Sequence, residues 1–160
     1  VYDIAIVDMQ MPGMDGAALG IKIKNNPDLK ETRLVMLTSL GLRNDAAQMK
    51  ELGFSAYLTK PVKQAYLFKC LAMLLQKKEQ KLAGNRKPLA AKHPLAQSQK
   101  SKIAILVVED NHINQKVIMN ILNKMGYQAE MASNGRVALA ELADKAYDIN
   151  ARMGNSILSA

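Results

Sequence analysis

The stretch that decides the fold lies near the start of the chain and reads Ile4-Ala5-Ile6-Val7, followed directly by Asp8. This apolar run has the length of a buried β-strand, and the turn-forming residues from Met11 to Gly16 end it. Strand-like runs recur along the chain at 34–38, 56–59, 103–108 and 127–132. Helix-like patterns separate them at 17–25, 44–52, 64–77, 111–125 and 135–145. Apolar strands alternating with helices predict an α/β, doubly wound domain with five parallel strands.

The composition is that of an ordinary globular protein about one domain long. The 160 residues are 49% hydrophobic and 22% charged. The single cysteine, Cys70, cannot form an internal disulfide, which favours a reducing compartment. No apolar run approaches the roughly 20 residues that a membrane-spanning helix needs. We therefore expect a cytoplasmic segment without membrane contact.

The net charge of +8 is concentrated in one segment. Between Lys77 and Lys102 there are eight Lys or Arg residues and one Glu, a local net charge of +7. This segment contains Pro and Gly and lacks the interleaved aromatic residues of a nucleic-acid stacking surface. The pattern predicts a basic linker at 78–101 between two structured parts, 1–77 and 102–149, and no nucleic-acid partner.

A short internal repeat links the two ends of the chain. Val1-Tyr2-Asp3-Ile4 resembles Ala146-Tyr147-Asp148-Ile149, which lies 145 residues later. The first copy leads into a buried strand, whereas the second leads into a polar stretch that cannot replace that strand. A tandem array cut once inside each of two neighbouring copies would give this pattern. Residues 150–160 are therefore interpreted as a tail of non-native appearance.

Polar residues follow the predicted strands at the point where each strand ends. Asp8, Thr38 and Lys60 each follow an apolar run, and Glu109-Asp110 follows the run 103–108. Because parallel strands end at the same edge of a sheet, we expect these groups to share one crevice. Several carboxylates together require a cation, and hard oxygen ligands suit Mg²⁺. With a lysine and a hydroxyl nearby, this set suits phosphoryl transfer, in which one carboxylate could act as the nucleophile.

Four segments together resemble the receiver domains of response regulators. The segment 7–16, Val-Asp-Met-Gln-Met-Pro-Gly-Met-Asp-Gly, looks like the phosphoacceptor segment of that family, and Leu37-Thr38-Ser39 resembles its switch-hydroxyl strand. The segment 57–61, Tyr-Leu-Thr-Lys-Pro, resembles its switch-aromatic and lysine-proline segment. The segment 105–111, Ile-Leu-Val-Val-Glu-Asp-Asn, resembles its first strand with an acidic pair. The resemblance implies a flavodoxin-like fold and a signalling module that accepts a phosphoryl group, not an enzyme.

The resemblance assigns Asp8 as the phosphorylated residue. By the same resemblance, Asp8 and Asp110 would bind Mg²⁺, with Glu109 acting partly through water and the backbone carbonyl of Gln10 as another ligand. The phosphoryl donor would be the phosphohistidine of a histidine kinase or a histidine phosphotransfer domain, and self-dephosphorylation would be slow.

The family also implies roles for three residues beside the phosphoacceptor. Lys60 would pair with the phosphoryl oxygens, and its peptide bond to Pro61 is expected to be cis. Thr38 would donate a hydrogen bond to the phosphoryl group, and Tyr57 would respond by turning inward. Phosphorylation would shift the population of states through its added negative charge.

The order of the segments departs from that of the family. A receiver begins with the acidic-pair strand, whereas this chain has the second half first and the first half last. The halves resemble parts of two neighbouring receivers of a hybrid sensor histidine kinase. Two arrangements remain open: a circularly permuted domain closed within one chain, or a homodimer that exchanges halves.

Two other functions compete with this interpretation. Phosphatases of the haloacid-dehalogenase class also use Asp, Thr or Ser, Lys and an acidic pair in this chain order. They require a second Asp two residues after the nucleophile, where this chain has Gln10. The other alternative is a folded but inert fragment whose halves never form a competent site.

Overall fold

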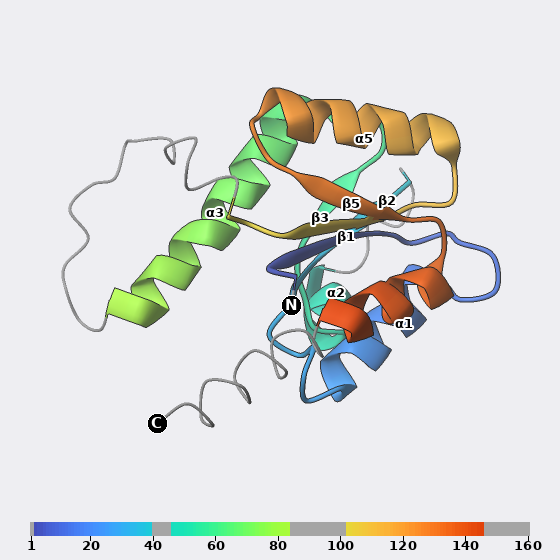
Figure 1. Cartoon of the computed structure of the whole chain (residues 1–160), viewed down its shortest axis with the longest axis horizontal. Helices are drawn as coiled ribbons and strands as arrows, with labels where there is room; N and C mark the ends of the chain where they lie inside the picture. Colours follow the sequence, from blue (N-terminus) through green and yellow to red (C-terminus); the bar gives the residue numbers. More distant parts are fainter. Residues whose placement is uncertain (1, 40–45, 84–101, 146–160) are drawn as a thin grey trace, which may run out of the picture.

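The computed structural model describes residues 2–39, 46–83 and 102–145. Within these ranges the chain forms one sheet of five strands in the spatial order β3-β2-β1-β4-β5 (Figure 1). Neighbouring strands are parallel throughout. The sheet confirms the predicted α/β fold with five parallel strands. The strands are β1 (Ile4–Asp8), β2 (Arg33–Thr38), β3 (Phe54–Thr59), β4 (Ile105–Val108) and β5 (Ala129–Ala132).

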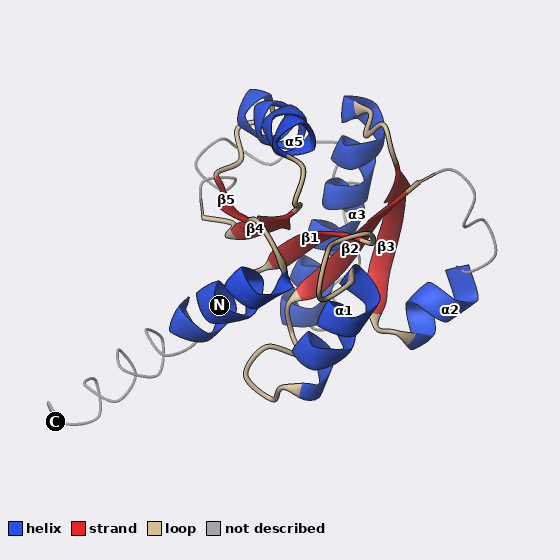
Figure 2. Cartoon of the chain, turned by 90° about the vertical axis from the view of Figure 1, so that its right-hand side faces the viewer, coloured by secondary structure: helices blue, strands red, loops and turns tan. Residues whose placement is uncertain are grey.

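The helices cover both faces of the sheet. In Figures 1 and 2, α5 lies on the opposite side of the sheet from α1. A further helix spans residues 135–145. None of the helices in the described ranges is long and apolar enough to cross a membrane. The labelled helices are α1 (Gly16–Asn25), α2 (Ala46–Glu51), α3 (Gln64–Ala83) and α5 (His112–Lys124).

The alternation of side chains along β1 divides the core into two layers. Ala5 and Val7 pack with α1 and the helix at 135–145. Ile4 and Ile6 pack on the other face, with α3 and α5. All five residues of β1 are buried, as expected for a central strand covered on both faces.

The central pairing joins segments that are far apart in the sequence. Residues 4–7 of β1 lie in register with residues 105–108 of β4. Asp3 extends this pairing, because its N–H donates to the carbonyl of Ala104 at 2.8 Å and its side chain accepts from the Ala104 N–H at 3.1 Å. Beside it, the hydroxyl of Tyr2 donates to Glu130, which also pairs with Lys145. The two parts on either side of the predicted linker therefore form one sheet and one core.

Several elements differ in extent from the sequence prediction. Strand β3 starts at Phe54, not at Ala56, and β4 starts at Ile105, not at Ile103. Helix α3 continues to Ala83, six residues into the predicted linker, because Gln, Lys, Glu, Leu and Ala are good helix formers. Helix α2 ends at Glu51, one residue before the predicted end at 52, and residues 44 and 45 lie outside the described residues. Strand β5 starts at Ala129, not at Tyr127, because the Tyr127 N–H donates to the Leu122 carbonyl at 3.0 Å and closes α5 beyond Gly126. The rest of the predicted linker, the second repeat copy and the tail at 150–160 lie outside the described residues.

Candidate functional site

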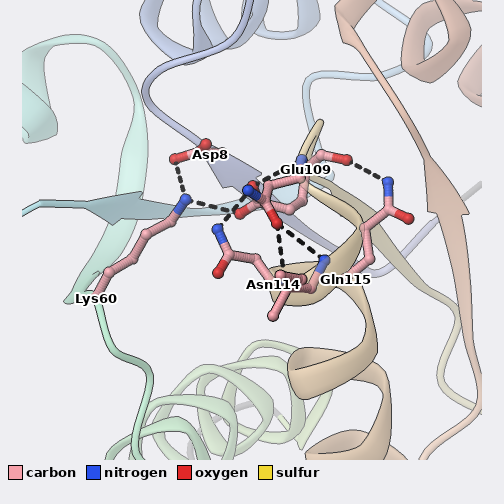
Figure 3. A network of polar contacts seen from close by, with 7 residues as sticks. Asp8, Lys60, Glu109, Asn114 and Gln115 are labelled. Atoms are coloured by element: carbon pink, nitrogen blue, oxygen red, sulfur yellow. Dashed lines mark hydrogen bonds and ion pairs between the residues drawn. The ribbon is translucent and has the colours of Figure 1, made fainter.

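The carboxyl edge of the sheet brings together acidic and basic side chains from three strand ends. Asp8 is the last residue of β1, Glu109 follows β4, and Lys60 follows β3. Figure 3 shows the three side chains pointing toward one another. Because neighbouring strands are parallel, residues from opposite ends of the sequence meet at this edge.

Lys60 bridges two buried carboxylates. Its Nζ lies 2.8 Å from Oδ1 of Asp8 and 2.8 Å from Oε2 of Glu109 (Figure 3). The side chains of Asp8 and Glu109 are 5% and 0% exposed, whereas that of Lys60 is 21% exposed. Burial alone would lower the pKa of Lys60, but the two ion pairs outweigh that effect and raise the pKa above its ordinary value. The lysine is therefore held charged between the two carboxylates.

Asp110 adds a third carboxylate to this cluster. One oxygen from each of Asp8, Glu109 and Asp110 lies within 4.8 Å of the other two. Asp110 is partly exposed, so the cluster opens to solvent on its side. In the described part of the chain, no donor makes a hydrogen bond of good geometry to Oε2 of Glu109, which has only the ion pair with Lys60. Carboxylate oxygens are hard ligands, and Oε2 of Glu109 is a buried oxygen without such a hydrogen bond among the described residues. Such a set suits a small divalent cation such as Mg²⁺.

Two amide side chains on the first turn of α5 contact Glu109. The side-chain amide of Asn114 donates to Oε1 of Glu109 at 3.1 Å, and the Asn111 N–H donates to the same oxygen at 3.2 Å. The side-chain amide of Gln115 donates to the backbone carbonyl of Glu109 at 2.7 Å (Figure 3). Asn114 and Gln115 are not among the site residues predicted from the sequence. Their position at the start of a predicted helix, just after the acidic pair, is the one sequence feature that indicates a contact with Glu109.

The loop after β1 fixes the backbone of Asp8. The Met9 N–H donates to the carbonyl of Leu37 at 2.9 Å, and the Gly16 N–H donates to the carbonyl of Met9 at 3.0 Å. Asp15 caps α1 by accepting from the Ala18 N–H at 2.7 Å. A Cβ atom on Gly16 would lie 2.4 Å from the carbonyl oxygen of Asp8. Gly16 therefore allows α1 to start directly against the backbone that carries the candidate nucleophile.

The remaining predicted site residues lie around this cluster. Thr38 is buried at the end of β2, and its carbonyl accepts from the Lys60 N–H at 2.8 Å. Tyr57 on β3 is 49% exposed. Gln10 is exposed in the loop after β1. The Lys60-Pro61 peptide bond is cis, as expected.

Residues 1–72 match the family described as the response regulator receiver domain. The chain is 41% identical over 66 residues to the response regulator PleD of Caulobacter vibrioides, covering 41% of this chain and 14% of PleD. It is 43% identical over 47 residues to hybrid signal transduction histidine kinase K of Dictyostelium discoideum, covering 29% of this chain and 4% of that kinase. A solved receiver domain of a signal transduction histidine kinase from Syntrophus aciditrophicus is 33% identical. This alignment covers 55% of this chain and 64% of that one, with a TM-score of 0.43.

The chain thus spans 14% of the length of PleD and 4% of the length of the Dictyostelium kinase. Its sequence match covers the segment that contains the candidate nucleophile and the lysine. Residues 1–72 thus resemble the response regulator receiver domains, and the described residues form a five-stranded parallel sheet.

Proposed function

We propose that this chain is a receiver domain that accepts a phosphoryl group on Asp8 from a phosphohistidine of a histidine kinase or a histidine phosphotransfer domain. The observation that carries the proposal is the cluster at the carboxyl edge of the sheet, where Lys60 bridges Asp8 and Glu109. A carboxylate at a strand end beside a fixed ammonium group suits attack on a phosphoryl group, because such transfer depends on position and charge neutralisation.

The transfer forms one bond and breaks one bond. A carboxylate oxygen of Asp8 attacks phosphorus, an O–P bond forms, and the N–P bond of the phosphohistidine breaks. The electron pair of that bond stays on the imidazole nitrogen, which takes up a proton. Slow hydrolysis of the aspartyl phosphate by water then returns Asp8 and inorganic phosphate. Lys60, released from Asp8 by the product, pairs with the phosphoryl oxygens in this proposal.

Asp8, Glu109 and Asp110 would bind Mg²⁺, together with the backbone carbonyl of Gln10. The three carboxylates lie close enough to share one cation. Bound Mg²⁺ supplies charge neutralisation for the incoming phosphoryl oxygens. The three carboxylates supply the side-chain ligands. When no divalent cation is bound, the charge of Lys60 reduces the repulsion between Asp8 and Glu109.

Thr38 and Tyr57 are proposed to transmit the phosphorylation event. Thr38 is buried at the end of β2, next to the strand end that bears Asp8. Its hydroxyl makes a long contact of 3.4 Å to the Ser39 carbonyl, so it can exchange this partner for a phosphoryl oxygen at little cost. Tyr57 is half exposed and turns inward after Thr38 moves. Because Tyr57 lies on the edge strand β3, this rotation changes the surface offered to a partner.

We also propose that the chain is a circularly permuted receiver built from two neighbouring receivers of a hybrid sensor histidine kinase. The acidic-pair strand, β4, comes late in the sequence yet pairs with β1 in the centre of the sheet. The repeated Tyr-Asp-Ile sequence supports an origin in tandem receivers. Light scattering coupled to size exclusion separates the closed monomer from a homodimer that exchanges halves. The single cysteine, which cannot form an internal disulfide, favours a cytoplasmic location.

The experiment that tests the function is phosphorylation by a small phosphodonor. The chain is incubated with acetyl phosphate and Mg²⁺, and its intact mass is measured. We expect one added phosphoryl group on the wild-type chain and none on Asp8→Asn. Asp28→Asn, which changes an exposed aspartate away from the site, is the matched control and keeps the adduct. A wild-type chain without an adduct would leave the inert fragment as the better interpretation.

A second assay separates the domain from a phosphatase. Sustained Mg²⁺-dependent release of phosphate from a generic phosphate ester would favour the haloacid-dehalogenase class. The exposed Gln10, which stands where that class needs a second Asp, argues against this activity.

A further inference from the structure

We propose that Asn114 is a positioning residue that orients the carboxylate of Glu109, and that Gln115 supports it by fixing the backbone of the same residue. This inference rests on the proposed function, because it concerns the cation that the proposed reaction needs. It concerns two residues outside the four segments by which the chain resembles its family.

The two oxygens of Glu109 have different surroundings. Oε1 accepts two hydrogen bonds, from the Asn114 side chain at 3.1 Å and from the Asn111 N–H at 3.2 Å. Oε2 accepts no hydrogen bond of good geometry from the described residues and faces Lys60. The two neutral donors therefore both contact Oε1, whereas Oε2 faces Lys60, which also pairs with Asp8.

This asymmetry has a physical consequence for cation binding. The terminal torsion of a Glu side chain is broad and roughly two-fold, so a buried carboxylate without directed donors takes up several orientations. The Asn114 amide, together with the Asn111 N–H, restricts that torsion and keeps Oε2 directed at the cluster. An amide does this without adding charge, whereas a cationic donor would compete with the divalent ion for the same carboxylate.

Gln115 acts on the backbone of Glu109. Its amide donates at 2.7 Å to the Glu109 carbonyl, at the point where the chain leaves β4 and enters α5. The opposite side of this residue is fixed by the sheet, since the Glu109 N–H donates to the Ala132 carbonyl at 3.1 Å. With both backbone groups bonded, the Cα of Glu109 has little freedom, and the Asn114 contact then sets the side chain.

Capping of α5 does not account for the Asn114 contact. The cap of this helix is Asn111, whose side chain accepts from the N–H groups of Ile113 and Asn114. The Asn114 side chain points back to Glu109 and donates. Loss of the Asn114 side chain therefore leaves the cap intact, and its effect on cation binding can be separated from an effect on helix stability.

The test measures Mn²⁺ binding by electron paramagnetic resonance, with Mn²⁺ as the probe for the divalent ion and Mg²⁺ as the competitor. The variants are Asn114→Ala and Gln115→Ala, and the matched control is Asn120→Ala, an exposed asparagine on the same helix. Removing a residue that orients a metal ligand typically weakens metal binding about 10-fold to 100-fold. We expect a loss of about 10-fold for Asn114→Ala, partial recovery in Asn114→Gln and no change in Asn120→Ala.

Thermal unfolding without divalent ions is the second readout. A purely structural role predicts a lower unfolding midpoint with unchanged Mn²⁺ affinity of the folded chain, and that result would overturn the positioning role. Equal Mn²⁺ affinity in Asn114→Ala and in wild type would overturn it as well. So would a wild-type chain that binds no Mn²⁺.

Phosphorylation of the wild-type chain is scored separately from these results. If acetyl phosphate gives no adduct while Asn114→Ala still weakens Mn²⁺ binding, the proposed function fails and the positioning role stands. If the adduct forms on Asp8 and Mn²⁺ binding is equal in the two chains, the positioning role fails alone.

Discussion

Replacing Lys60 with methionine removes the only charge that bridges Asp8 and Glu109 in the described structure. Methionine keeps most of the length of the side chain but leaves the two buried carboxylates without their shared cation. Oε2 of Glu109, which makes no hydrogen bond of good geometry, then has no partner among the described residues. We therefore expect Lys60→Met to destabilise the chain in the absence of divalent ions.

The magnitude follows from the distances in the cluster. Two unit negative charges no more than 4.8 Å apart repel by at least about 3.5 kcal/mol at an effective dielectric constant of about 20. Removing one partner of a buried ion pair typically costs about 3–5 kcal/mol. Because the Lys60 side chain is 21% exposed and its burial has its own cost, we reduce this to a loss of about 2–4 kcal/mol.

Divalent ions should reverse most of this loss. A ligand at 100 times its dissociation constant stabilises the folded chain by about 2.7 kcal/mol. The gain should be larger in Lys60→Met than in wild type, because the lysine ammonium lies in the same acidic cluster and repels a second cation. The sign of this difference tests whether the lysine and the divalent ion share one site.

The assay is urea unfolding followed by circular dichroism at pH 7, with EDTA and with saturating Mg²⁺. Lys63→Met, at an exposed lysine three residues away, is the matched control and should unfold like wild type in both conditions. The reasoning is refuted if Lys60→Met lies within about 0.5 kcal/mol of wild type in EDTA. A smaller Mg²⁺ gain in the variant than in wild type would also contradict it.

Three further predictions concern other parts of the chain. Gly16→Ala would place a Cβ atom 2.4 Å from the Asp8 carbonyl oxygen. We therefore expect urea unfolding to show a loss of about 1–3 kcal/mol, and we expect less phosphorylation of Asp8. Unchanged phosphorylation would contradict this. Burial raises the pKa of Cys70 from 9.0 to about 11, so its contribution to stability is fully present below pH 9 and is lost as the pH rises to 11. Between pH 9 and pH 11 the free energy of unfolding should fall more in wild type than in Cys70→Ala. An equal fall in the two chains would contradict the burial of this thiol. Tyr2→Phe removes the hydroxyl that donates to Glu130 and should cost about 0.5–1.5 kcal/mol, with a positive coupling to Glu130→Gln in a double-mutant cycle; additive effects would argue against the contact.

The strands and the residues at their ends could be predicted from the sequence for a simple reason. Each apolar run ends in a polar residue, and parallel strands place those ends at one edge. Asp8, Lys60 and Glu109 are therefore expected at one edge of the sheet, and the structure brings Lys60 within ion-pair distance of the two carboxylates. This expectation needs no knowledge of which half of the chain comes first, because sheet pairing does not depend on chain order.

The hydrogen bonds that orient the site could not be predicted in the same way. Whether Asn114 meets Glu109 depends on the angle at which α5 leaves β4, and this angle is set by the packing of Ile118 and Leu122 on the sheet. The length of α3 was missed for a different reason. Its last turns have polar residues with high helix propensity, which the search for apolar periodicity overlooks.

The pairing of β1 with β4 makes the candidate site a composite of two separate stretches of chain. A fragment ending at Ala83 contains Asp8 and Lys60 but lacks Glu109 and Asp110, and a fragment starting at Lys102 contains the reverse set. Neither fragment alone has all three carboxylates of the cluster formed by Asp8, Glu109 and Asp110. Mixing the two fragments and recording Mn²⁺ uptake would therefore report, without any label on the protein, that the pieces have reconstituted the sheet.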